Sequence, residues 1–166
     1  AVLAGSASAE AGRSGGAGAV EQADNPVGEL RTKCLGVNEP EGGDVDITAE
    51  DVLVVVGRGI ESEDNIEEAQ ELAEALGGAV AASRPIIDQG WLPKTRQVGK
   101  SGLTVKPKVY LTLGVSGAPE HIEGMKDAAT IISINTDPQA PIFGVAHYGW
   151  EGDIFDLLPE LIDALE

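Results

Sequence analysis

Short apolar segments that run into glycine, serine or asparagine recur four times in the second part of the sequence. They are DVLVVVGRG (51–59), GAVAAS (78–83), KVYLTLGVSG (108–117) and TIISIN (130–135). An unbroken apolar run such as residues 52–56 is typical of a parallel strand buried on both faces, because a strand with one exposed face alternates apolar and polar residues. We therefore expect these segments to be the strands of a parallel sheet.

Helical patterns lie between and after these strands. SEDNIEEAQELAEALGG (62–78) has apolar residues at helical spacing, with Asp64 and Glu67 as a candidate capping box and Gly77 or Gly78 as the end. The final DIFDLLPELIDAL (153–165) places six apolar residues on one face, and its proline should fall in the first turn or two. Alternating strands and helices predict an α/β parallel sheet, whose ligands bind at the carboxyl ends of the strands.

The first part of the sequence has a different character. Residues 1–26 are rich in Ala, Gly and Ser without sustained periodicity, which is typical of a flexible arm or linker. GELRTKCLGV (28–37) is compatible with a short strand, and NEPEGGD (38–44) is a turn-rich acidic break. We expect a flexible or linker-like segment over residues 1–44 and one domain over residues 45–166.

Charge and cysteine content exclude several function classes. The chain has 28 acidic and 11 basic residues, a formal net charge of −17 and a pI near 4.3. This balance argues against nucleic acid or an anionic membrane as partner, and it is expected of a halophilic protein that stays soluble in concentrated salt. Cys34 is the only cysteine, so no intrachain disulfide or cysteine-cluster metal site is expected. Without an apolar run of about 18 residues or a signal-peptide pattern, we expect a cytoplasmic protein without membrane insertion.

One segment is basic. Six of the eleven Lys and Arg residues lie between residues 83 and 108, where Asp88 is the only acid: Arg84, Lys94, Arg96, Lys100, Lys106 and Lys108. TRQVGKSG (95–102) ends like a Walker A loop, but Lys94 stands where that motif needs its first glycine, and the preceding WLPKTR is polar and proline-broken. Two alternatives remain, namely a phosphate or pyrophosphate clamp and a solvated loop whose lysines pair with neighbouring acids.

Five motifs occur in one order and spacing between residues 50 and 166. They are GRG, ASR, QVGKSG, GVSGAPEHIEGMKDA and INTDPQAPIFGVAHYG. Together they resemble the FAD-binding carboxyl-terminal domain of the electron-transfer flavoprotein alpha subunit. The resemblance implies a three-layer Rossmann-like parallel sheet with helices on both faces, which binds FAD in an extended conformation over residues 45–166.

The resemblance also implies three contacts with the flavin ring. Arg58 would reach the ring, and Arg84, which follows Ser83, would lie near N5, where a cation stabilises the electron-rich reduced ring. His121 would hydrogen-bond the O2 side as a cationic or donor imidazole. The residues by themselves leave plainer alternatives, which are a surface ion pair for Arg84 and a helix cap or surface position for His121.

Other positions would hold the remainder of the cofactor, again by resemblance. Those lining the flavin and ribityl region would be Gln97, Val98, Gly99, Ser101 and Gly102, with Lys100 facing solvent. Backbone amides of Ser116, Gly117 and Ala118 would point at the pyrophosphate from a predicted helix start. Asn135 and Asp137 would contact the adenosine or ribose, although ordinary turn chemistry before Pro138 explains them equally well.

Three positions depart from the family pattern. Glu120, which we also place at the cofactor, stands where glutamine is usual, Thr136 stands where lysine is common, and His147 replaces an aspartate. For the contacts with the adenine end and the tuning of the redox potential, the resemblance is therefore a weaker guide than for the other contacts.

The function implied is that of an electron carrier rather than an enzyme. FAD would accept electrons from acyl-CoA or other flavin dehydrogenases and pass them to a quinone oxidoreductase or similar acceptor, with an electron-transfer flavoprotein beta subunit as partner. The alternative is a nicotinamide- or adenine-nucleotide-binding domain with a transferase or sensor role. No nucleophile and base pair and no His–carboxylate cluster stand out, so we expect neither catalytic residues nor a metal. Residues 1–44 are too few for the amino-terminal domain of an alpha subunit.

Overall fold

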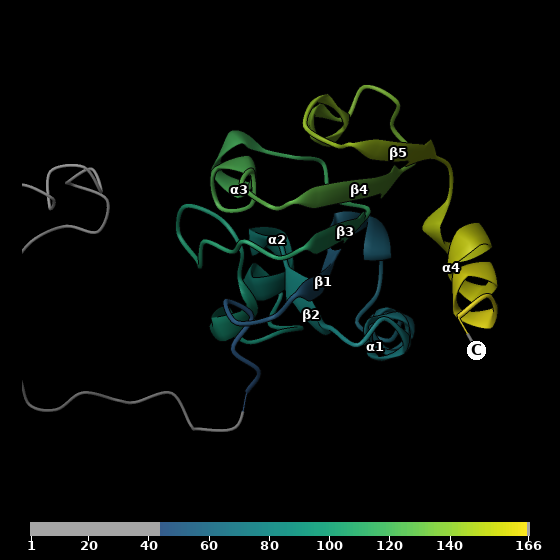
Figure 1. Cartoon of the computed structure of the whole chain (residues 1–166), viewed down its shortest axis with the longest axis horizontal. Coiled ribbons are helices and arrows are strands. Elements are labelled where there is room, and N and C mark those ends of the chain that lie inside the picture. Colours follow the sequence, from purple (N-terminus) through teal and green to yellow (C-terminus); the bar gives the residue numbers. More distant parts are fainter. Residues whose placement is uncertain (1–43, 166) are drawn as a thin grey trace, which may run out of the picture. The chain divides into compact units, whose positions relative to one another are not determined.

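A single parallel sheet organises the chain (Figure 1). The computed structural model describes residues 44–165, so the predicted arm at 1–26 and short strand at 28–37 lie outside the described residues. Its strands are β1 (Val52–Val56), β2 (Ala79–Ala82), β3 (Val109–Leu113), β4 (Thr130–Asn135) and β5 (Tyr148–Glu151). They pair in the order β2-β1-β3-β4-β5, all parallel. The first four strands confirm the segments predicted from the apolar runs.

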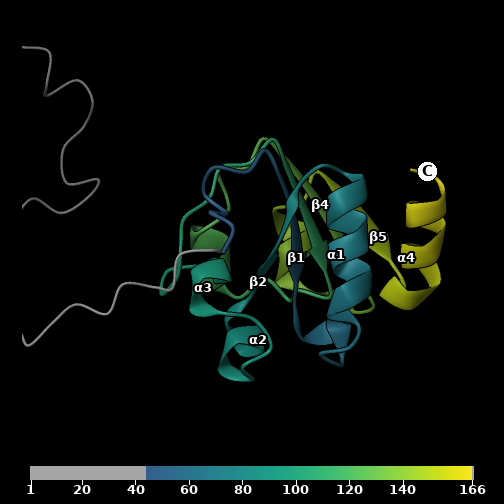
Figure 2. The same ribbon diagram turned by 90° about the horizontal axis from the view of Figure 1, so that it is seen from below.

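Helices cover both faces of this sheet. The α-helices are α1 (Ile66–Ala75), α2 (Arg84–Asp88), α3 (Pro119–Glu123) and α4 (Ile154–Asp163), and the 3-10 helices are η1 (Arg58–Ile60), η2 (Lys94–Arg96) and η3 (Pro141–Gly144). Figure 2 shows α1 and α4 on one side of the sheet and α3 on the other. The predicted three-layer, Rossmann-like α/β fold is therefore confirmed.

Two hydrophobic clusters sandwich the sheet. Val54 and Val56 of β1 pack with residues of α1 and α4, whereas Leu53 and Val55 belong to a second cluster on the opposite face. This division follows from the two-residue period of a strand. All four residues are fully buried, which is why β1 reads as a continuous apolar run.

The start of α1 differs from its prediction. Its N-cap is Asn65, in helical conformation and without a side-chain cap, so the expected capping box of Asp64 and Glu67 is wrong. Asn65 instead donates from Nδ2 to the Ile60 carbonyl at 2.8 Å. The tertiary contact with η1 thus fixes the helix start.

The end of α1 matches its prediction. Gly77 has φ +67°, its N–H bonds the Glu74 carbonyl at 2.9 Å, and the N–H of Gly78 bonds the Ala73 carbonyl at 2.8 Å. Glycine adopts this left-handed conformation without a steric penalty, and these bonds satisfy carbonyls at the last turn.

Strand β5 was not predicted. All four of its residues are exposed, including Tyr148 at 67%, whereas all four residues of β2, the other outer strand, are buried. An exposed strand such as β5 has no buried apolar run that would identify it in the sequence.

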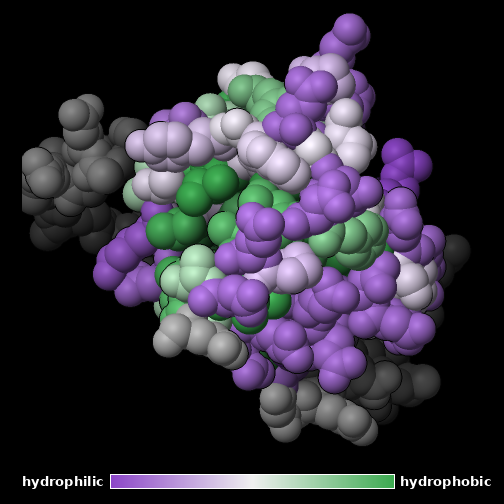
Figure 3. All heavy atoms as spheres, turned by 90° about the vertical axis from the view of Figure 1, so that its right-hand side faces the viewer, coloured by the Kyte–Doolittle hydropathy of each residue, from purple (hydrophilic) through white to green (hydrophobic). Residues whose placement is uncertain are grey.

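The surface near α4 is mainly hydrophilic, with hydrophobic patches between the charged groups (Figure 3). Asp153 is the N-cap residue of α4, and its carboxylate accepts a hydrogen bond from the Phe155 N–H at 3.0 Å. The helix contains Pro159, as expected. In the part of the chain that the structure describes, none of the helices combines the length and apolar character needed to cross a membrane.

Candidate functional site

A cavity of about 810 Å³ opens at the carboxyl ends of the strands, within the usual ligand-pocket range of about 300–1,000 Å³. Its walls come from the segments after β1, β2, β3 and β4. The chain moves outward from β1 to β2 and then returns across β1 to β3, which makes this edge a topological switch point. Of the residues predicted to form a site, those lining the cavity are Arg58, Ser83, Arg84, Gln97, Val98, Gly99, Ser101, Ser116, Gly117, Ala118, Glu120, His121, Asn135 and Asp137.

Glycines let the loops after β1 and β3 pass in contact at the cavity floor. Gly114 has φ +63°, and a Cβ added there would lie 2.5 Å from the Cα of Gly59. The N–H of Gly59 donates to the Gly114 carbonyl at 3.1 Å. No larger residue fits this crossing without moving one loop, so these glycines shape the cavity.

Three consecutive residues with free backbone amides line the cavity in the loop between β3 and α3. Among residues 44–165, no acceptor bonds the N–H groups of Ser116, Gly117 or Ala118, although the Ser116 carbonyl accepts from Ile142 at 3.1 Å. Gly117 has φ +83°, and a Cβ on it would collide with the Ile142 backbone. Successive free N–H groups of this kind form an anion-binding concavity.

QVGKSG is held alongside β2 by the backbone. Val98 donates to the Ala82 carbonyl at 2.9 Å, and Lys100 donates to the Glu120 carbonyl at 2.7 Å. Gln97, a buried side chain, donates from Nε2 to Ser101 Oγ at 2.8 Å, so its amide nitrogen is already engaged.

Gly102 is the exception among the predicted residues, because it does not line the cavity. A Cβ there would collide with the Gln97 carbonyl. The close approach of the Gln97 carbonyl explains the glycine, and a direct cofactor contact at Gly102 stays a prediction.

Cations stand at the rim of the cavity. Arg84 forms an i,i+4 ion pair with Asp88 at 3.4 Å, and their side chains are 68% and 64% exposed. Lys100 is equally exposed and lies 3.7 Å from Glu123, in agreement with its predicted solvent-facing position. The surface ion pair considered for Arg84 is thus present, and both of its residues line the cavity.

Three other cations of the basic segment pair with acids that do not line the cavity. Arg96, Lys106 and Lys108 bind Asp44, Asp127 and Asp51, respectively. For these three residues the alternative of a loop neutralised by its neighbours is confirmed. A side-chain phosphate clamp is therefore reduced to the cations that line the cavity.

His121 is buried at the cavity wall and is neither a cap nor a surface residue. Its Nε2 lies 2.9 Å from the hydroxyl of Tyr110, and Nδ1 has no hydrogen-bond partner among the described residues. Burial lowers the pKa of His121 from 6.5 to about 4, although the neighbouring Val98 backbone acts in the opposite direction. The ring is neutral near neutral pH, which excludes the cationic form among the two forms, cationic or donor, that the resemblance implied.

Asn135 and Asp137 mainly shape the loop after β4. Asn135 donates to the Val115 carbonyl and accepts from the Asp137 N–H, both at 2.9 Å. Asp137 uses one carboxylate oxygen to accept from Gln139 at 2.9 Å. The turn chemistry considered for both residues is confirmed, and Asp137 retains a second oxygen at the cavity.

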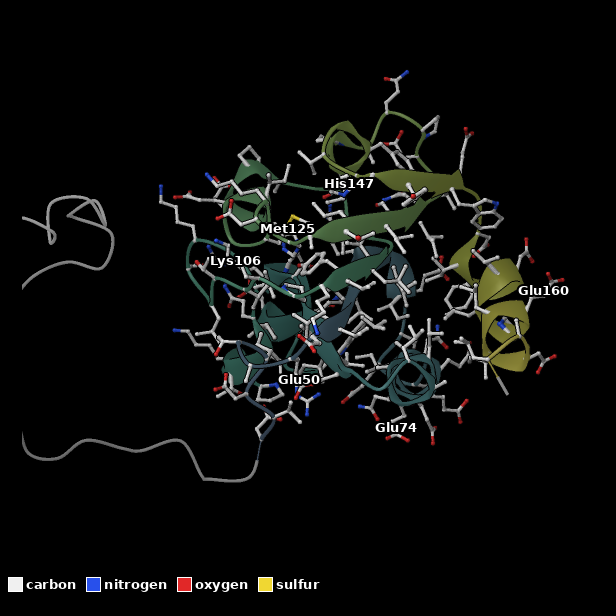
Figure 4. All side chains as sticks on the ribbon, viewed as in Figure 1. Glu50, Glu74, Lys106, Met125, His147 and Glu160 are labelled. Carbon is white, nitrogen blue, oxygen red and sulfur yellow. The ribbon has the colours of Figure 1, made fainter. Side chains whose placement is uncertain are left out.

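The three residues that depart from the family pattern differ in whether they line the cavity. Glu120 lines the cavity, whereas Thr136 and His147 do not. His147 precedes β5 (Figure 4), and its Nδ1 accepts from the Ile131 N–H at 2.9 Å. The imidazole therefore acts as a backbone acceptor that fastens β5 to β4.

Two residues of the candidate site were not identified from the sequence. Asp88 lines the cavity beside Arg84, and the i,i+4 spacing of the two residues was the available signal. Tyr110 supports His121 from within β3, where it was counted as part of an apolar run. A phenol in a buried strand needs a polar partner, which was the signal that could have identified it.

The parallel sheet, the switch-point cavity and the free amides define a nucleotide-binding α/β domain. Within residues 44–165 no group of three His, Cys, Asp or Glu side chains could hold a metal ion.

Comparison with known proteins identifies the family. Residues 46–126 match the model of the "Electron transfer flavoprotein FAD-binding domain". Electron transfer flavoprotein subunit alpha of Methylophilus methylotrophus is 47% identical over 148 residues, covering 88% of this chain and 46% of that protein. Protein FixB of Clostridium saccharobutylicum is 47% identical, covering 81% and 40%. Acryloyl-CoA reductase electron transfer subunit beta of Anaerotignum propionicum is 45% identical, covering 83% and 38%.

The chain belongs to the electron transfer flavoprotein alpha family and contains its FAD-binding domain. It spans about half the length of the curated relatives that it matches. The resemblance drawn from the five motifs is thereby confirmed.

Proposed function

We propose that this chain binds FAD in the cavity and serves as the FAD-binding part of an electron carrier. One observation carries the proposal: in a chain of this family, one cavity is lined by Ser116, Gly117 and Ala118, whose backbone N–H groups have no acceptor among the described residues. The free amides suit a pyrophosphate, a group that FMN lacks.

The chain's own residues would hold and orient the cofactor. The amides of Ser116, Gly117 and Ala118 would bind the pyrophosphate, and the second oxygen of Asp137 would accept from a ribose hydroxyl. Arg58 and Arg84 would reach the ring from the ends of β1 and β2, with Ser83, Gln97, Val98, Gly99, Ser101 and Glu120 along the wall. Bound FAD supplies reversible one- and two-electron transfer, and the protein adds charge and hydrogen bonds that set its potential.

The wider proposal concerns the whole carrier. Acyl-CoA or other flavin dehydrogenases would reduce it, a quinone oxidoreductase or similar acceptor would oxidise it, and a beta subunit would complete the flavin site. No substrate chemistry of its own is proposed. The FAD-binding domain would span residues 45–166 after a linker-like segment, in the cytoplasm of a cell with concentrated salt, which the formal charge of −17 supports.

Cofactor identity is the first test. The purified chain, after incubation with FAD and removal of the excess, should release FAD on denaturation, identified by chromatography. Release of FMN, of a nicotinamide or adenine nucleotide, or of nothing would refute the proposal. Co-expression with a beta subunit should give a one-to-one heterodimer by light scattering, and absence of association in high salt would count against the carrier.

A matched pair of variants tests the position of the cofactor. Ser116 is exposed at the cavity wall, so Ser116→Leu should leave the fold intact and weaken FAD binding at least about tenfold, because the side chain would displace the anion from the amides. Thr104, exposed and outside the cavity, provides Thr104→Leu as the control, which should bind normally. Equal affinities would place the cofactor elsewhere.

Opposing variants test the cation at the rim. An exposed pair is worth about 0.2–1 kcal/mol, and about 59 mV corresponds to tenfold for one electron. Arg84→Ala should therefore lower the first reduction potential by about 10–40 mV, and Asp88→Asn should raise it by a similar amount. Lys108→Ala, outside the cavity, is the control. Spectroelectrochemical titration measures all three, and shifts of the same sign for Arg84→Ala and Asp88→Asn would remove the pair from the site.

A further inference from the structure

One segment covers the outer edge of β2. The carbonyl of Val80 accepts from Nη1 of Arg96 at 3.1 Å, and the carbonyl of Ala82 accepts from the N–H of Val98 at 2.9 Å. Carbonyls two residues apart in a strand point to the same edge, and in the described sheet β1 is the strand on the other side of β2. The arginine side chain therefore extends, along this edge, the hydrogen bonding that the Val98 backbone provides.

Asp44 holds this arginine side chain in place. Its Oδ1 accepts from Nε of Arg96 at 2.8 Å and lies 2.6 Å from Nη2, and its Oδ2 accepts from the hydroxyl of Thr95. The side chains of Arg96 and Asp44 are 17% and 23% exposed, whereas in the other ion pairs within residues 44–165 both side chains are more than half exposed. All three guanidinium nitrogens are thus engaged, which requires the planar fork of an arginine.

One wall of the cavity begins directly after Arg96. The residues of this wall are Gln97, Val98, Gly99, Lys100 and Ser101. At its far end, the N–H of Lys100 donates to the Glu120 carbonyl at 2.7 Å. At its start, the wall is bound to β2 by the hydrogen bonds of Arg96 and Val98. Loss of the guanidinium would leave the carbonyl of buried Val80 without this donor and the start of the wall with one hydrogen bond to β2.

We propose that Arg96 is a positioning residue, which Asp44 orients and which fastens the cavity wall of residues 97–101 to the edge of β2. Neither Arg96 nor Asp44 lines the cavity, so both act on a ligand through the wall. Asp44 precedes β1 and lies 52 positions before Arg96, so the segment that leads into the sheet contributes to the shape of the cavity. The consequence for FAD rests on the proposed function, whereas the position of the wall does not.

The position of the wall is tested on the full chain without FAD, by ¹H–¹⁵N correlation spectra. Asp44→Ala changes a residue far from the wall in the sequence, and it should shift the amide signals of Gly99, Lys100 and Ser101. Asp51→Ala is the matched control, because Asp51 binds Lys108 at 2.7 Å and neither residue lines the cavity. Wall signals that do not move in Asp44→Ala, or that move equally in both variants, would overturn the proposal.

Affinity for FAD tests the consequence for the cofactor. Arg96→Met keeps an unbranched side chain and removes the guanidinium, and it should bind FAD about three- to tenfold more weakly, as should Asp44→Ala. Because Asp44 acts through Arg96, the double variant should be no weaker than the weaker single variant. Additive losses, or an unchanged affinity in Arg96→Met, would overturn the proposal.

Arg96→Lys separates position from charge. Lysine keeps the charge but has no fork that could bond Val80 and Asp44 together, so it should recover less than half of the affinity that Arg96→Met loses. Full recovery would show that charge alone matters and would overturn the positioning role. Lys108→Met removes another cation of the same basic segment and should bind FAD normally.

Two controls keep the outcomes separate. Circular dichroism verifies that each variant is folded under the conditions of the titration, so that a lower stability does not lower the apparent affinity. If the parent binds no FAD while its wall signals respond to Asp44→Ala, the proposed function alone is contradicted.

Discussion

Acidification should destabilise the folded protein through one buried histidine. Burial lowers the pKa of His121 from 6.5 to about 4, so the unfolded state binds an extra proton between these values. The contribution of the neutral ring is therefore fully present above the unfolded pKa, decreases as the pH falls, and is lost below the folded pKa. Because this side chain is 6% exposed, solvent screening reduces the effect little.

The size of this effect follows from the two pKa values. The complete loss corresponds to about 3 kcal/mol at about 1.4 kcal/mol per pH unit. Between about pH 7.5 and about pH 5 the free energy of unfolding should fall by about 2 kcal/mol through His121 alone.

Urea unfolding at constant salt, followed by circular dichroism, measures the difference between the parent and His121→Gln at each pH. All other ionisable groups are common to the two proteins, so their contributions cancel in the comparison. The stability of the parent relative to the variant should decrease on acidification, whatever the offset at neutral pH. Parallel curves for the two proteins would refute the buried neutral histidine, and His147→Gln should reproduce the parent's steeper slope.

Two further predictions compare matched positions. Gly114→Ala should cost at least about 2 kcal/mol in urea unfolding, because φ is +63° and its Cβ would lie 2.5 Å from Gly59, whereas Gly144→Ala meets nothing within 4 Å and should change stability by less than about 0.5 kcal/mol. Asp44→Asn should cost about 1 kcal/mol, because the Arg96 hydrogen bond holds the pKa of Asp44 below 3.8 and gives stability that is lost only as the pH falls through the folded pKa. Asp51→Asn, whose carboxylate is 67% exposed, should cost less than about 0.5 kcal/mol, and the reverse order would contradict this reasoning.

The sequence was most informative where one segment determines its own environment. The apolar run of β1 predicted a strand buried on both faces, and Gly77 predicted a helix end that only glycine makes easily. These features depend on neighbours in the sequence, so local patterns identify them. β5 and the start of α1 depend instead on pairing with β4 and on the contact of Asn65 with Ile60, which no local pattern contains.

For the candidate site, the sequence predicted which residues lie near the cavity better than it predicted their hydrogen bonds. Segments after parallel strands converge at one edge of the sheet, so the motifs correctly indicated which residues would meet around a cavity. They did not indicate how each side chain would be used, because that depends on atoms from other segments. Gln97 is engaged with Ser101, and Asn135 joins the loops after β3 and β4.

This use of side chains determines what remains for a ligand. Since Gln97 and Asn135 donate from their side-chain amides within the protein, the backbone N–H groups of the loop after β3 become more important for a ligand, together with the charged residues that line the cavity. Backbone donors depend on loop shape rather than on side-chain identity, and the shape depends on Gly114, Gly117 and the turn around Asn135. Substitutions at these shaping positions should therefore impair binding of an anionic ligand as severely as substitutions of residues that touch it, although they remove no contacting side chain.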